Sequence, residues 1–176
     1  MDLAVDPEFF DLLVESYRRS VGAPPPFLEA GQPHSALWLY QDASHCVVAH
    51  NTDADPRFIY ANRAAQARFG YNWDEFTSLP SRLSAEAPDR AERQRLLDAV
   101  ARNGFAAGYR GLRIAKSGQR FWIEDGVVWQ LVDRDGVLRG QAATFSRWRP
   151  SDWPLAGFSG PIASGYPLRL AKLHPP

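Results

Sequence analysis

A change of periodicity at Gly104 is the feature that most constrains how this chain can fold. Residues 89–103 have the pattern of a helix, with Leu96 and Val100 on one face. Beyond Gly104, β-branched and aromatic residues dominate three segments, at 108–115, 119–133 and 137–147. Turn residues separate these segments, so we expect a long helix followed by a three-stranded antiparallel meander.

The middle segment of this meander is interrupted by the pair Asp125-Gly126. We expect a β-bulge at this point, because strand-like residues flank the pair on both sides. The extra residue of a bulge would place Trp122 and Trp129 on the same face of the strand. A tight hairpin at Asp125-Gly126 is the alternative.

Two shorter strand-like runs, at 44–51 and 57–62, flank a turn-rich connector and predict a hairpin-like pair. Asn62 is suited to cap a short helix, which Gly70 can end in a left-handed conformation. Asn72 begins a second short helix with the spacing of a capping box. The order of strands and helices predicts an α+β fold with one five-stranded antiparallel sheet and short helices on one face.

The two ends of the chain differ from this central part. Residues 1–33 combine an amphipathic helix at 7–19 with a Pro-rich linker, because three consecutive prolines from Pro24 cannot continue a helix. Residues 149–176 are rich in proline and glycine and predict an irregular tail. The domain division is therefore 1–33, a core at 34–148, and 149–176.

Composition narrows the class of protein. The 176 residues are 45% apolar, which excludes disordered and fibrous classes. Twenty basic residues balance twenty acidic ones. Arg90, Arg93 and Arg95 alternate with acidic residues, which predicts a solvated helix face, so we expect no nucleic-acid binding. The acidic start and the lack of a long apolar run predict no secretory signal, no membrane contact and a cytoplasmic location.

Several runs of sequence carry a resemblance to known families. The run FIYANRAAQARFGYNWDEF, at 58–76, resembles the first half of PAS domains, and the meander resembles the second half. The runs HNTDADPRFIYANRAA, EFTSLPSRLSAE, RLLDAVARNGF and GQAATF are similar to the bacterial stand-alone MEKHLA family, which is regarded as PAS-like. The resemblance covers about residues 7–148 and leaves the tail outside.

This resemblance implies a sensory or regulatory domain that binds a small organic ligand between the sheet and the helices. The 176 residues contain no segment that resembles a homeodomain, a zipper, a kinase or a cyclase, so we expect a signal to pass by protein contact. We expect the helix at 7–19 to form a homodimer or to bind a partner protein, since its apolar stripe must be buried.

No cofactor is predicted. Covalent flavin photochemistry of the light-oxygen-voltage type needs a cysteine in the helical half, whereas Cys46 lies on the first strand. Heme sensing in this fold needs a histidine on the long helix, and residues 89–103 contain none. Cys46 and His50 share a strand face but lie roughly 13 Å apart between Cα atoms, so no metal site is predicted.

Aromatic density is the best sequence clue to a pocket, although most of these rings are also suited to a core. Polar groups that could orient a ligand lie among these aromatic residues. Arg82 could bind an anion or form a salt bridge with Glu86 or Glu124. Gln141 faces inward only if it lies on the same side of its strand as Phe145. The predicted ligand-binding residues are His50, Tyr60, Phe69, Trp73, Arg82, Tyr109, Trp122, Glu124, Trp129, Gln141 and Phe145.

Two other functions remain open. The first is a small-molecule enzyme that uses His50 as a general base, with Arg82 or Gln141 holding an anionic intermediate. No nucleophile or metal motif supports catalysis, so an enzyme is the less favoured interpretation. The second is a ligand-free protein interaction module with a filled core.

Overall fold

The computed structural model describes residues 2–85 and 87–151, apart from the side chains of residues 87–90 and 92. Its elements, in chain order, are the 3-10 helix η1 (Leu3–Val5), α1 (Pro7–Val21), α2 (Ala36–Gln41), β1 (Cys46–His50), β2 (Phe58–Ala61), α3 (Arg63–Phe69), α4 (Trp73–Thr77), the 3-10 helix η2 (Ser81–Ser84), α5 (Ala87–Asn103), β3 (Phe105–Ile114), β4 (Arg120–Val132), β5 (Leu138–Phe145) and β6 (Arg147–Pro150). Within the described part, no helix has both the length and the apolar character needed to cross a membrane.

The sheet has the order β2-β1-β5-β4-β3, and every neighbouring pair is antiparallel. The predicted α+β fold with a five-stranded antiparallel sheet is therefore confirmed. An added strand, β6, pairs with the first half of β4, from Phe121↔Pro150 to Glu124↔Arg147. The prediction of irregular structure from residue 149 is wrong for its first two residues, because a proline at the end of a strand removes no needed donor. The remainder of the predicted tail, residues 152–176, lies outside the described residues.

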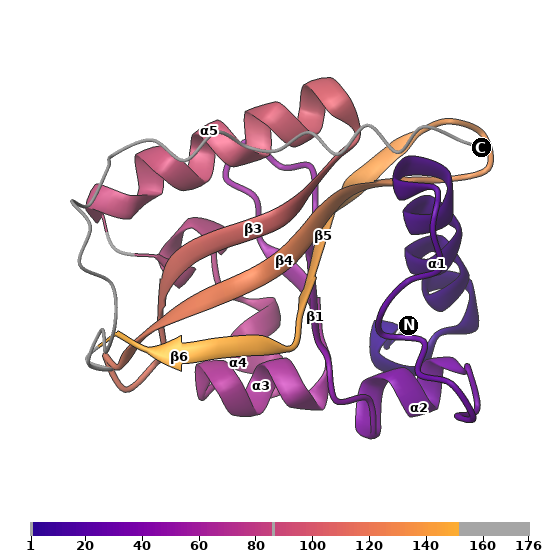
Figure 1. Ribbon diagram of the computed structural model, residues 1–176, viewed down its shortest axis with the longest axis horizontal. Helices are drawn as coiled ribbons and strands as arrows, with labels where there is room; N and C mark the ends of the chain where they lie inside the picture. Colours follow the sequence, from indigo (N-terminus) through magenta and orange to yellow (C-terminus); the bar gives the residue numbers. More distant parts are fainter. Residues whose placement is uncertain (1, 86, 152–176) are drawn as a thin grey trace.

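Helices cover both faces of the sheet (Figure 1). On the face that we call inner, α3, α4 and α5 pack over a core cluster that includes Phe69, Phe76 and Phe121. On the other face, called outer, α1 and α2 pack over a second cluster centred on Trp129. The two clusters use alternate side chains of the same strands, as the two-residue period of a strand requires.

The N-terminal helix α1 forms as its sequence predicts. Asp6 caps it by accepting a hydrogen bond from the backbone amide of Glu8 at 3.0 Å, and Gly22 ends it with φ 74°. Its apolar stripe lies on the sheet, where the rings of Tyr17 and Trp129 meet edge to face with centroids 5.0 Å apart. Phe27, from the Pro-rich linker, is fully buried in the same cluster, so the linker lies against the core.

The bulge predicted in β4 is present. Between the pairs Tyr109↔Gly126 and Gly111↔Ile123, β3 advances by two residues and β4 by three, and Asp125 in the added position has φ 54°. The bulge brings Trp122 and Trp129 to the same face, as expected. That face is the outer one, because Phe121, next to Trp122, packs on Phe69 of α3.

Asn62 is both the predicted cap of α3 and the link between three elements. Its Oδ1 accepts hydrogen bonds from the amides of Ala65 and Val47, at 3.1 and 2.9 Å. Its Nδ2 donates to the carbonyls of Leu39 and His45, at 3.1 and 2.8 Å. The side chain is fully buried, and it joins α2, β1 and α3.

The sequence analysis missed one α-helix, α2, and the two 3-10 helices. Helix α2 is only six residues long, so its periodicity is weak. The signal available for it was the cap at Ser35, whose side chain accepts a hydrogen bond from the amide of Trp38 at 3.2 Å.

Candidate functional site

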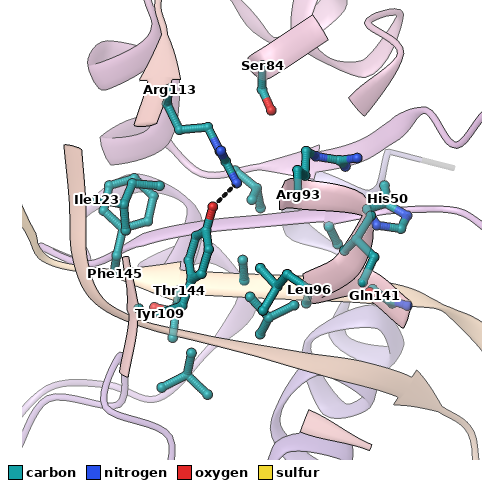
Figure 2. Close-up of a pocket in the computed structure, with 18 of the residues that line it drawn as sticks. His50, Ser84, Arg93, Leu96, Tyr109, Arg113, Ile123, Gln141, Thr144 and Phe145 are labelled. Atoms are coloured by element: carbon teal, nitrogen blue, oxygen red, sulfur yellow. Dashed lines mark hydrogen bonds between the residues drawn. The ribbon is translucent and has the colours of Figure 1, made fainter. Parts of the chain in front are cut away.

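A cavity of about 60 Å³ lies between the inner face of the sheet and α5. Its walls come from all five main strands, from α3, α5 and η2, and most of the side chains are apolar (Figure 2). The lining residues are Val48, Ala49, His50, Phe58, Phe69, Ser84, Arg93, Leu96, Leu97, Tyr109, Arg113, Ile123, Gly126, Val127, Val128, Gln141, Ala142, Ala143, Thr144 and Phe145. At this volume the cavity has room for about four to six water molecules.

Five of the predicted ligand-binding residues line this cavity: His50, Phe69, Tyr109, Gln141 and Phe145. Gln141 faces inward, because it lies on the same side of β5 as Ala143 and Phe145. The other six predicted residues, Tyr60, Trp73, Arg82, Trp122, Glu124 and Trp129, are not among the lining residues.

Three of these six belong to the outer cluster. Tyr60 and Trp73 contact each other with ring centroids 5.9 Å apart, and Phe9 of α1 packs on Tyr60 at 5.3 Å. Trp129 is fully buried beneath Tyr17 and Phe27. The expectation that these rings face the ligand cleft is corrected, because α1 and the linker cover the second face of the sheet.

Trp122 and Glu124 also point to the outer face. The guanidinium of Arg110 stacks over Trp122, with its central carbon 4.5 Å from the ring centroid. Glu124 forms an ion pair with Arg149 of β6 at 2.9 Å, so its partner is neither Arg82 nor a ligand in the cavity.

Arg82 lies at the surface. It forms an ion pair with Asp55 through two hydrogen bonds, of 3.0 and 3.2 Å, and about half of its side chain is exposed. The partner seen is thus not Glu124, and Glu86, the other glutamate considered from the sequence, lies outside the described residues. The same short helix η2 instead directs Ser81 and Ser84 to the interior, and Ser84 lines the cavity.

His50 presents a basic nitrogen to the interior. Its Nδ1 lies 2.8 Å from the carbonyl of Asn51, which can only accept, so Nδ1 carries the proton and donates it. Nε2 is then an acceptor, and it is buried without a hydrogen-bond partner among the described residues. Burial lowers the pKa of His50, the hydrogen bond to Asn51 raises it, and the charge of Arg93 lowers it further. The imidazole is therefore neutral at neutral pH.

His50 and Gln141 are neighbours across β1 and β5, where they form a register pair. The Oε1 of Gln141 is also buried without a partner in the described structure. Gly140 permits this close pairing, since a Cβ at that position would lie 2.0 Å from the carbonyl oxygen of His50. Two residues that line the cavity at β1 and β5 thus each carry a buried acceptor without a partner among the described residues.

Two arginines that the sequence analysis did not select also line the cavity. Arg93 and Arg113 are each only 8% exposed. The interpretation of residue 93 as part of a solvated helix face is wrong. The available signal was its position three residues before Leu96 and seven before Val100, which places it on the buried face of α5. For residue 113, the signal was an even spacing from Tyr109 along β3.

These arginines are held by neutral oxygen atoms. Arg93 donates from Nη2 to the hydroxyl of Ser81 at 2.8 Å. Arg113 donates to the carbonyl of Leu112 at 2.8 Å and to the hydroxyl of Tyr109, which lies at the centre of Figure 2. Burial lowers the pKa of Arg93 to about 10, and the charge of Arg113 acts in the same direction. The guanidinium of Arg93 therefore remains charged at neutral pH.

Cys46 belongs to the inner core, away from any metal-binding cluster. Burial raises the pKa of its thiol to about 12. His45 faces Glu29 at 3.7 Å. Among the described residues, no group of three or more His, Cys, Asp or Glu side chains lies close enough together to hold a metal ion.

Comparison with solved structures supports the fold. A PAS domain from Colwellia psychrerythraea superimposes with a TM-score of 0.53 and 15% identity, over 63% of this chain and 89% of that one. The photo-excited blue-light photoreceptor Vivid superimposes with a TM-score of 0.52 and 19% identity, over 77% and 94%. The dark structure of the Aureochrome1 LOV domain gives 0.50 and 19%, over 58% and 74%. At these identities the similarity is one of fold.

None of the curated proteins matches this chain. The model of the MEKHLA domain family matches residues 7–150, which is most of the sequence and includes all the strands and helices from α1 to β6. The chain has a PAS-like fold and belongs to the MEKHLA domain family.

Proposed function

We propose that this protein is a sensory or regulatory domain that binds a small organic ligand in the cavity of the inner face and signals by protein contact. The observation that carries the proposal is the pair of buried acceptors, His50 Nε2 and Gln141 Oε1, at the wall of a largely apolar cavity. A buried polar atom without a partner costs about 1–3 kcal/mol. A ligand that donates hydrogen bonds to these atoms would remove that cost.

β4 connects the cavity to the N-terminal helix. Ile123 and Val128 of β4 line the cavity, whereas Trp129 and Leu131 of the same strand pack under α1. A ligand that displaces β4 would change the packing of α1 on the other face. This arrangement supports a signal that leaves through the N-terminal region, where we propose that a second copy or a partner protein binds.

Exposed apolar side chains support this choice of surface. Val5 of η1 and Leu37 of α2 are 44% and 51% exposed, and η1 packs against α2. The apolar stripe of α1 itself is buried in the chain, so contact would involve these flanking side chains and the polar side of α1. Sedimentation velocity of the full chain and of the Val5→Ser/Leu37→Ser variant tests this part of the proposal, which predicts weaker association of the variant.

Native mass spectrometry of the protein purified from its own host tests ligand binding. We expect a noncovalent mass excess over the denatured protein. The excess should be lost in Leu96→Phe, because a phenyl ring at this lining position would fill the cavity. The matched control is Leu37→Phe, at an exposed position. Native protein without added mass, together with no small molecule that raises its melting temperature, would contradict the proposal and favour the ligand-free interaction module.

A catalytic use of the same cavity is the second candidate, and the free Nε2 of the neutral His50 is the observation that favours it. Arg82 does not line the cavity and pairs with Asp55 at the surface, so it is not placed to hold an anionic intermediate there. Turnover that is lost in His50→Ala, while ligand affinity persists, would identify an enzyme. Loss of affinity without any measurable turnover in the unmodified protein would identify a sensor.

A further inference from the structure

We propose that the ligand is a short hydroxycarboxylate, whose carboxylate pairs with Arg93 and Arg113 and whose hydroxyl group donates to His50. This inference rests on the proposed function and deepens it, because it assigns the chemical class of the ligand. It also assigns a ligand-binding role to two residues that the sequence alone did not select.

Arg93 and Arg113 have no ion-pair partner among the described side chains. These two buried arginines line one cavity of about 60 Å³. Buried charges in proteins are paired, because an isolated charge loses several kcal/mol of hydration. An anion in the cavity would supply the missing partner.

The carboxylate of Asp55, the acidic group among the described residues that acts on Arg93, does not remove this requirement. Its charge opposes the charge of Arg113. Asp55 already forms two hydrogen bonds with Arg82, and 49% of its side chain is exposed. Its charge is therefore shared with a surface arginine and with solvent.

The shape of the site favours a carboxylate. Each guanidinium can present two parallel donors to a planar carboxylate, so two arginines can hold one such group from different directions. The remainder of the cavity is apolar, with Val48, Leu96, Ile123, Val128 and Phe145 in its walls. A fully charged tetrahedral anion would leave these side chains without contacts, whereas a short carbon chain would pack against them.

The unpartnered acceptors favour a hydroxyl group on that carbon chain. The Nε2 of His50 requires a donor from the ligand, since its own proton is on Nδ1. Figure 2 places His50 and Gln141 on the same side of the cavity as Arg93. A three-carbon 2-hydroxy acid has the charge, the donor and the size that the site requires.

The test is the thermal stability of the full chain with L-lactate, propionate and lactamide, in buffer whose ionic strength is held constant with sodium chloride. We expect lactate to raise the melting temperature in proportion to the logarithm of its concentration. Propionate, which lacks the hydroxyl group, should bind at least threefold more weakly. Lactamide, which lacks the charge, and inorganic phosphate should bind at least tenfold more weakly.

Arg93→Gln and Arg113→Gln should each weaken lactate binding by about tenfold to a hundredfold. Arg110→Gln is the matched control, because this arginine lies on β3 three residues before Arg113 but stacks on Trp122 at the outer face. It should leave lactate affinity unchanged. Should a glutamine variant fail to fold, the lysine variant at the same position keeps the charge and should bind lactate more weakly than the wild-type chain.

Equal affinity for lactate and lactamide, for lactate and propionate, or for lactate and phosphate would overturn the inference. Wild-type affinity in both arginine variants would overturn it as well. A neutral compound that stabilises the chain and loses its effect in Leu96→Phe, when no carboxylate binds, would overturn this inference and leave the proposed function intact. If no small molecule of either kind stabilises the protein, the inference and the proposed function both fail.

Discussion

The hydroxyl of Tyr109 accepts a hydrogen bond from the guanidinium of Arg113, four residues further along β3. Side chains at these two positions share one face of the strand, and Gly111 lies between them. The ring of Tyr109 occupies the space above this glycine, since an added Cβ there would lie 1.8 Å from the hydroxyl oxygen. The absence of a side chain at Gly111 thus allows the ring of Tyr109 to lie along β3 and reach Arg113.

Gly111→Ala should displace Tyr109 and break its hydrogen bond to Arg113. We expect the free energy of unfolding to fall by about 1–3 kcal/mol, as is usual for overpacking in a core. Urea denaturation measures this change. In a Tyr109→Leu background the same substitution should cost much less, because the side chain that clashes is gone. An equal cost in both backgrounds would show that the ring is not the cause.

Asn62→Ala should be among the most destabilising substitutions at a helix cap in this chain. It leaves the amide of Val47 and the carbonyls of Leu39 and His45 without their partner, so we expect a loss of about 3 kcal/mol or more. Asn72→Ala is the matched control, because Asn72 caps α4 at an exposed position, and it should cost about 1 kcal/mol. Equal losses in chemical denaturation would contradict the role of Asn62 as a link between elements.

The stability of the protein should depend on pH through His50. Its pKa in the folded chain lies below the ordinary value of 6.5, mainly because of burial, so the folded state binds fewer protons than the unfolded state just below pH 6.5. The stabilisation from a neutral His50 is therefore complete above pH 6.5 and is lost as the pH falls toward the lowered pKa.

Urea denaturation between pH 5 and pH 8 checks this dependence. His50→Gln should flatten the profile on its acidic side. His34→Gln should leave the profile as it is, because His34 is exposed. Parallel profiles for the wild-type chain and His50→Gln would contradict the assignment.

Cys46 should resist thiol reagents in the folded protein. Its thiol is buried and its pKa is raised to about 12, so almost no thiolate is present at neutral pH. We expect reaction with Ellman's reagent only after unfolding, at a rate set by the population of opened chains. Fast reaction in native buffer, compared with the same chain in urea, would contradict the burial of this side chain.

Leu13→Ala tests whether α1 belongs to the cooperative fold. Leu13 is fully buried in the outer cluster, so we expect a loss of about 2–5 kcal/mol. Leu37→Ala, at a position 51% exposed, should change stability by about 0.5 kcal/mol or less. A separate early transition in thermal unfolding, with the main transition unchanged, would mean instead that α1 is an independent arm.

Local rules were enough to predict most of the elements. Asn62 and Gly70 bound α3 as expected, since capping and a left-handed conformation depend on a few consecutive residues. The bulge at Asp125 was also predictable, and with it the shared face of Trp122 and Trp129. Short or terminal elements escaped prediction because α2 and β6 have too few residues to establish a period.

The site was harder to predict than the elements. Periodicity predicts that Trp129 and Val128 point to opposite faces of β4, and this holds. It contains no information on which of the faces is covered by α5 and which by α1. Only the packing of distant segments decides that Trp129 lies under α1 while Val128 borders the cavity.

The sequence by itself determined the order of the strands and helices, their caps and the alternation of side chains along each strand. These properties depend on hydrogen bonds and backbone angles within a few residues. The tertiary structure alone decided that Arg93, Arg113 and His50 line one cavity, because they come from a helix and two strands that meet only when the sheet closes against α5. It also placed Arg82 at the surface, where this arginine, which the sequence suggested as an anion-binding residue, forms an ion pair with Asp55.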